Sequence, residues 1–150
     1  MTMNATRPAR RRLPSFLTCD DILGLLNDDF AHECRSIYGY AVYAERFKAM
    51  GNEKLATAIE QRGRMEVRHA QTLCQMIYDF GGTVTSVVDE LNAVLNADRV
   101  ADPCWNQDAI RRLRDRVRQL RSIGEPGLAK RLTNVLKAKR SAMDLSELIG

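Results

Sequence analysis

The chain lacks the features that would mark it as a membrane or secreted protein. Its 150 residues contain no run of about 18 uncharged apolar residues, so no membrane-spanning helix is expected. The N-terminus has no apolar stretch of the secretion-signal kind and is instead basic, with Pro8 and Pro14 among four arginines. We expect residues 1–15 to form a disordered basic tail, residues 16–150 to form one domain, and the protein to be cytoplasmic.

Cysteine is scarce and widely spaced. Cys19, Cys34, Cys74 and Cys104 are well separated and include no Cys-x-x-Cys pair. Without an export signal, free thiols are expected rather than a disulfide framework. Strand-like alternation of useful length is also missing, which leaves an all-α fold.

The net charge of +4 conceals an asymmetry along the chain. Residues 105–140 contain 11 Lys and Arg against three acids, a balance of +8, so the remainder carries −4. A stretch of this kind is either a solvated helix surface or a binding face for nucleic acid, an acidic partner or an anionic surface. Nucleic acid is not expected as the partner, because the stretch has no interleaved aromatic residues and no known nucleic-acid motif.

Apolar residues recur at three- and four-residue steps along four segments. They predict helices over 20–50, 52–80, 106–123 and 128–148, the first capped by Asp20 or Asp21. Glycine-containing turns join the first helix to the second and the third to the fourth, whereas a long connection, 81–104, joins the two pairs. This order predicts a ferritin-like four-helix bundle with one long crossover.

Three polar residues fall at positions where the apolar pattern requires core residues. Glu33 lies between Phe30 and Ile37, while Glu66 and His69 occupy successive inward positions of the second helix. Their i, i+3 spacing puts Glu66 and His69 on one helix face, where they could share iron, manganese or zinc. A Glu-x-x-His taken alone is more often a surface salt-bridge pattern, but Glu33 in register favours a metal site. His32, beside Glu33, is expected on the surface.

Residues 26–82 resemble the first helical pair of a bacterioferritin. The resemblance implies that Glu33 is a terminal iron ligand, that Glu66 bridges two irons and that His69 completes the shell of one. It also implies a second-shell place for Tyr40 beside the metal; the alternative is an ordinary core tyrosine. The positions that carry the resemblance are Leu26-Asn27, Glu33, Ile37, Tyr40, Gly51, Leu55, Glu66, His69-Ala70 and Ile77.

The chain departs from bacterioferritins at the haem position and in its second half. The position of the haem-binding Met is Val67, and Met65 would point about 100° away, so no haem is predicted. Where the second Glu-x-x-His should lie, the chain has Lys139 and Ala142. Residues 126–143 hold no acid and no His, and 99–106 offer only Asp102 as a further ligand.

Lys139 falls at an inward position of the fourth helix. We expect its ammonium to act as a metal-replacing cation beside Glu33 and Glu66. The alternative is that Lys139 lies at the edge of the seam and extends to solvent.

These observations predict a degenerate bacterioferritin-like subunit with an incomplete di-iron site. It would handle iron or serve assembly, as a homo-oligomer or beside a complete ferritin-like subunit, with weak or absent ferroxidase activity. One alternative is a metal-free interaction module that uses the basic 105–140 face. Another is a half-site ferroxidase completed at a subunit interface. Iron at a partial site is the one cofactor that these readings allow.

Overall fold

The computed structural model describes residues 17–85, 87, 105–142 and 145–149, and all its regular structure is helical. Two long helices, α2 (Cys19–Ala49) and α3 (Glu53–Asp79), form one hairpin. A second hairpin consists of α5 (Trp105–Ser122) and α6 (Pro126–Ser141), and a short α7 (Leu145–Ile149) follows it. The expected tail and most of the expected crossover lie outside the described residues.

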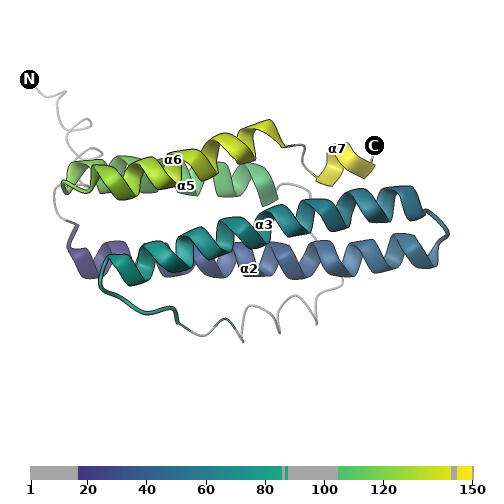
Figure 1. Cartoon of the computed structure of the whole chain (residues 1–150), viewed down its shortest axis with the longest axis horizontal. Helices are drawn as coiled ribbons and strands as arrows, with labels where there is room; N and C mark the ends of the chain where they lie inside the picture. The colour runs from purple at the N-terminus through teal and green to yellow at the C-terminus, as the bar shows by residue number, and fades with distance from the viewer. Residues whose placement is uncertain (1–16, 86, 88–104, 143–144, 150) are drawn as a thin grey trace, which may run out of the picture.

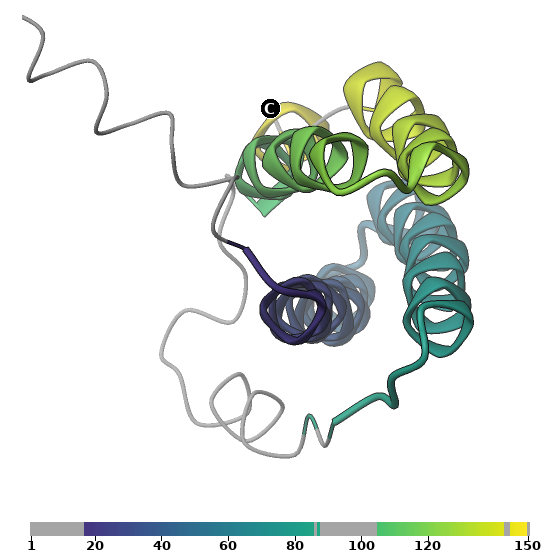
Figure 2. The ribbon, with the colours of Figure 1, turned by 90° about the vertical axis from the view of Figure 1, so that its left-hand side faces the viewer.

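The two hairpins pack into a four-helix bundle. Within each hairpin the partners run side by side, and the hairpins meet along α2–α5 and, less extensively, along α3–α6. Figure 2 shows the four helices at the corners of this arrangement. In Figure 1, α2 and α3 extend well beyond α5 and α6, and α7 lies over the extension, where it contacts α3. The main apolar core fills the end of the bundle at which all four helices overlap.

Local sequence signals explain the helix ends. Thr18 caps α2, because its hydroxyl accepts a bond from the Asp21 N–H while the Asp21 carboxylate accepts one from the Thr18 N–H. The prediction of Asp20 or Asp21 as the cap was therefore wrong, although Asp21 completes the capping box. Gly51, with φ of +84°, ends the turn before α3, where an L side chain would be strained.

The fourth predicted helix ends earlier than its apolar pattern indicated. Residues 128–148 were expected to be continuous, but α6 stops at Ser141 and the backbone is extended at Ala142. Asn106 of α5 explains the break in part, because its side-chain amide donates to the Lys139 carbonyl at 2.8 Å and to the Ala142 carbonyl at 3.5 Å. The last turn of α6 is thereby bonded to α5 instead of continuing its own ladder.

Candidate metal centre

The inward face of α2 changes from apolar to polar after Leu26. Ile22 and Leu26 are followed on this face by Asp29 and Glu33, both almost fully buried. Phe30 and Ile37, which were expected in the core, are only partly buried. A carboxylate in such a position requires a cation or hydrogen-bond donors, because its ionised form is poorly solvated there.

Glu33, Glu66 and His69 come together in the bundle interior. One ligand atom from each lies within 4.8 Å of the others, and each residue is at most 7% exposed. His69 Nδ1 is 2.5 Å from Glu66 Oε1 and 3.9 Å from Glu33 Oε1. This is a donor set of two carboxylates and one imidazole, which suits a single divalent transition metal.

Lys139 reaches the same cluster from α6. Its Nζ donates to Glu33 Oε1 at 2.6 Å and to Glu66 Oε1 at 2.9 Å, and the residue is 1% exposed. The side chain thus points inward, and the alternative of a solvent-exposed lysine is wrong. One ammonium group therefore bridges the two carboxylates that were predicted to hold metal.

A second cation and an amide extend the cluster beyond the predicted residues. Arg62, one turn before Glu66, donates from Nη2 to Glu66 Oε2 at 3.0 Å and to Asn106 Oδ1 at 2.6 Å. Asn106 in turn donates to the backbone carbonyl of Lys139. The cluster thereby joins α2, α3, α5 and α6. Arg62 and Asn106 were not singled out in the sequence, since each looks like an ordinary surface residue of a charged helix.

Burial and these cations shift the two carboxylates in opposite directions. Burial raises the pKa of Glu33 to about 7, against the attraction of Lys139 and with added repulsion from Glu66. Burial also disfavours ionised Glu66, but the hydrogen bond from His69 and the charges of Lys139 and Arg62 outweigh it and lower the pKa to about 2. Glu66 is therefore the permanent anion of the site, and Glu33 is the group that can take a proton.

Tyr40 lies one layer further along α2 and is 1% exposed. The Arg62 guanidinium stands over its ring, 5.8 Å from the centroid, so Tyr40 is connected to the cluster through a cation–π contact. Its predicted second-shell role toward a metal stays a prediction.

His32 is buried, contrary to the expectation of a surface residue. It is 5% exposed, and Arg35 lies with Nη2 3.1 Å from its Nδ1. The prediction failed because adjacent helix positions point only about 100° apart, and α2 is enclosed over more than one face.

A buried ion pair beside the cluster was also not foreseen. Arg116 of α5 donates from Nε to Asp29 Oδ2 at 2.6 Å and from Nη2 to Asp29 Oδ1 at 3.1 Å. Burial raises the pKa of Asp29, and the bonds and charge of Arg116 offset this only partly. The pair fixes α5 against α2 one turn from Glu33.

Ion pairs within the molecule reduce the number of unpaired positive charges on residues 105–140. Arg116 and Lys139 are buried in the pairs above, Arg131 pairs with Asp79, and Arg111 and Arg118 pair with Asp108 and Asp115 on α5 itself. Within the described chain, the remaining cations of this stretch have no ion pair; they are Arg112, Arg114, Arg121, Lys130, Lys137 and Arg140.

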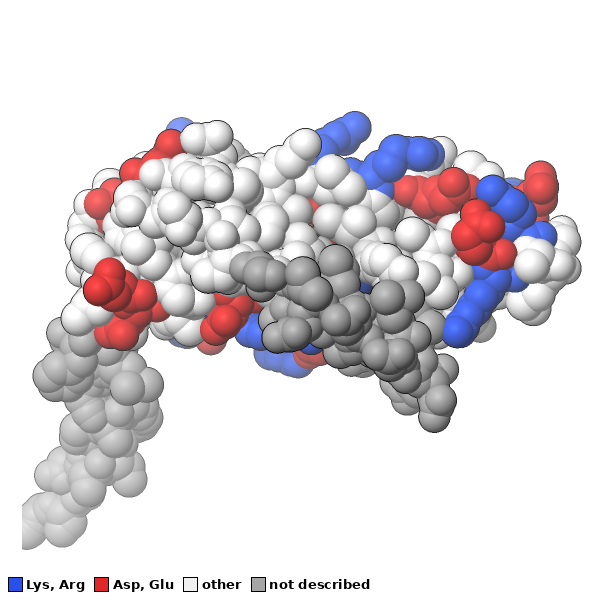
Figure 3. Space-filling model, turned by 90° about the horizontal axis from the view of Figure 1, so that it is seen from below, with Lys and Arg blue, Asp and Glu red and all other residues white. Residues whose placement is uncertain are grey.

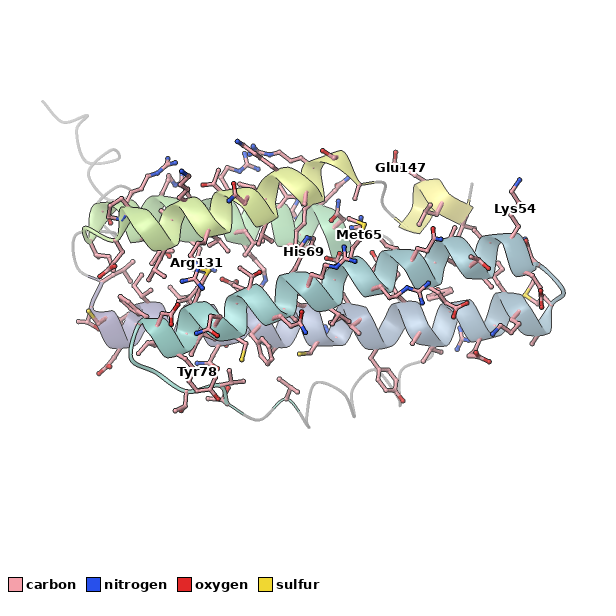
Figure 4. All side chains as sticks on the ribbon, in the orientation of Figure 1. Lys54, Met65, His69, Tyr78, Arg131 and Glu147 are labelled. Carbon is pink, nitrogen blue, oxygen red and sulfur yellow. The ribbon has the colours of Figure 1, made fainter. Side chains whose placement is uncertain are left out.

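A groove of about 720 Å³ between α3 and α6 leads to the cluster. Figure 4 shows Met65, His69 and Arg131 between these two helices. His69 lines both the groove and the buried cluster, so it is the contact between them. We call this cavity the α3–α6 groove, lined by Met65, Arg68, His69, Gln71, Thr72 and Gln75 of α3 and by Arg131, Asn134, Val135 and Ala138 of α6.

The fold and the carboxylate–imidazole cluster together define a ferritin-like helical protein of the di-iron class. Residues 24–116 match the family model of rubrerythrin, which covers more than half of the chain. The chain belongs to the rubrerythrin family. No curated protein and no solved structure was found to match it.

The family match confirms the ferritin-like di-iron assignment and the helical-bundle fold. The finer resemblance to bacterioferritin stays a prediction. The matched residues end within α5 and do not include Lys139. None of the helices in the described part of the chain is both long and apolar enough to cross a membrane.

The residues present do not fit a two-iron centre. Two irons need ligands from both hairpins, and here α6 contributes an ammonium that already contacts both carboxylates. A cationic donor group repels metal ions, and it occupies the space between the ligand oxygens. A single metal fits the chemistry of Glu33, Glu66 and His69 only if Lys139 is deprotonated or displaced.

Proposed function

We propose that this chain is a non-catalytic member of its family, in which the Lys139 ammonium takes the place of the di-iron centre. The observation that carries the proposal is the contact of one Nζ with Glu33 at 2.6 Å and Glu66 at 2.9 Å. The ammonium neutralises the carboxylates without a metal, and Arg62 balances the second negative charge. Two-iron oxidation of a substrate or of Fe²⁺ is therefore not the role of this chain.

The role left to the bundle is structural, either within a homo-oligomer or beside a complete ferritin-like subunit. The cluster is internal and joins four helices of one chain, which supports a stabilising rather than a reactive function. Residual iron handling would be restricted to one metal at Glu33, Glu66 and His69. Completion of the site by a neighbouring subunit has no support in this geometry, because α6 of the same chain covers the ligands.

Metal stoichiometry tests the proposal. Protein from iron-supplemented cells should contain substoichiometric iron, and titration of the wild type with Co²⁺ should give no visible ligand-field absorption. Lys139→Glu replaces the bridging cation with a carboxylate and should create Co²⁺ absorption near neutral pH. Lys137→Glu makes the same charge change at an exposed position of α6 and serves as the matched control.

Two further measurements keep the test decisive. Lys139→Gln removes the ammonium without adding a third buried carboxylate, so it should bind one Co²⁺ weakly even if Lys139→Glu folds poorly. Circular dichroism establishes that each variant is helical. About two irons per wild-type chain, lost on Glu66→Ala, would refute the proposal and show that a two-metal site forms.

A further inference from the structure

The surface around the α3–α6 groove is almost free of acidic residues. Over 61–78 of α3 the only acid is Glu66, which is 2% exposed, and 126–142 contain none. Five exposed cations stand on the same two stretches: Arg64, Arg68, Lys130, Lys137 and Arg140. Asp79, which pairs with Arg131, is the nearest exposed carboxylate along α3. Basic side chains therefore predominate on the stretches of α3 and α6 that form the groove.

The groove itself combines an apolar floor with polar walls. Met65, Val135 and Ala138 supply apolar atoms, whereas Arg68, Gln71, Gln75 and Asn134 supply donors. From Met65 to Gln75 the α3 wall is about 15 Å long, close to three helical turns. These dimensions suit a short segment of another chain that buries apolar side chains and places acidic ones at the rim.

We propose that the α3–α6 groove is the docking site for an acidic amphipathic segment of a partner protein. The apolar side chains of the segment contact Met65 and Val135, and its carboxylates pair with Arg68 and with the cations of α6. Charge complementarity selects the partner: in the described chain, the exposed acid that contacts a groove residue is Asp79, and its charge is already paired with Arg131. The proposal is independent of the role assigned to Lys139.

A protein segment fits the groove better than nucleic acid does. None of the lining residues is Phe, Tyr or Trp, and the one ring in the groove, the imidazole of His69, belongs to a residue only 7% exposed, so a base has little surface on which to stack. The apolar floor would also lie unused under a phosphate backbone. The lower face of the molecule differs in charge, because Figure 3, seen from below, shows acidic and basic side chains on it together.

The test measures binding of a fluorescent helical peptide made of Glu and Leu, with Leu at every third and fourth position, to the full chain. Binding should be detectable at low salt and should weaken as salt rises. The double change Arg68→Glu, Lys137→Glu should lower affinity by about tenfold or more. Lys48→Glu, Lys54→Glu makes the same charge change at the far tip of the α2–α3 hairpin, where Figure 4 shows Lys54, and should lower it by about twofold or less.

A charge-neutral variant distinguishes binding of the peptide in the groove from binding elsewhere on the basic surface. Thr72→Trp fills the groove without changing charge and should weaken the peptide at least as much as the double reversal. A Lys/Leu peptide of the same pattern should not bind. Equal losses in the two double reversals, unchanged binding by Thr72→Trp, or competition by a short DNA duplex that depends on Arg68 and Lys137 would each overturn the proposal.

Discussion

At the scale of single residues, Lys139 and the two glutamates depend on one another. A buried charge without a partner costs far more than the intact pair contributes, because desolvation is no longer offset. Lys139→Met should therefore lower the free energy of unfolding by about 3–5 kcal/mol, measured by urea denaturation near neutral pH. Lys137→Met, at an exposed position of the same helix, should change it by no more than about 0.5 kcal/mol. Similar values for the two variants would show that the Lys139 contacts contribute little.

Glu33 should give the protein an unusual dependence on pH. Its pKa is raised from 4.5 to about 7, so the folded state binds this proton more tightly than the unfolded state. The resulting stabilisation is fully present below pH 4.5 and is lost as the pH rises through 7. Urea unfolding should therefore show stability declining between pH 5 and 8, by at most about 3 kcal/mol from this group.

The variant Glu33→Gln isolates that effect, because it stays neutral at every pH. Its stability should be nearly flat between pH 5 and 8. Glu66 acts in a separate range: its pKa is lowered to about 2, so its contribution is present above pH 4.5 and is lost as the pH falls. An unchanged slope in Glu33→Gln would assign the decline to another group.

At the scale of helices, the Asp29–Arg116 pair determines how α5 is positioned on α2. Asp29→Leu leaves a buried guanidinium without its carboxylate and should cost about 3–5 kcal/mol of unfolding free energy. The double change Asp29→Leu, Arg116→Met removes both charges and should recover most of that loss. Urea denaturation of the two variants and of Arg116→Met alone completes the cycle. Additive effects would mean that the two side chains are not coupled.

Helix positions were predictable because they depend on local apolar periodicity. The expected bounds of α2, α3 and α5 agree with the structure within one residue at each end. The end of α6 was not predictable, since it is set by Asn106 of another helix. The contact of Lys139 with Glu33 and Glu66 could be predicted because each residue falls at an inward-facing position of its own helix. Asp29, Arg62 and Arg116 were missed because a charged residue in a charged helix gives no sign of burial until its distant partner is known.

At the scale of the whole molecule, the α2–α3 hairpin is longer than the α5–α6 hairpin. The extension of α2 and α3 therefore packs, through α3, against the short α7 instead of against a second full hairpin (Figure 1). The second apolar cluster, around Tyr40, Ala44 and Ile59, lies on the α2–α3 hairpin apart from the main core. Met50 at the hairpin tip is 74% exposed.

We expect self-association or pairing with a ferritin-like subunit, as the sequence predicted. Sedimentation of the purified chain should give a species heavier than a monomer, or co-purification from the native source should recover a ferritin-like companion. A lone monomer in both would contradict the expectation.

Hydrogen bonds hold both the side chain and the backbone carbonyl of Lys139, and this limits how the site could change by mutation. Its ammonium donates hydrogen bonds to Glu33 and Glu66, and its backbone carbonyl accepts one from Asn106. The Asn106 side chain in turn accepts a hydrogen bond from Arg62. A return to a two-metal site would have to replace the lysine and add several ligands, yet each single step leaves buried charge uncompensated. Such intermediates would be less stable than the present chain until a bound metal supplied the missing positive charge. Conversion to a two-metal site by single substitutions would therefore pass through destabilised forms of the protein.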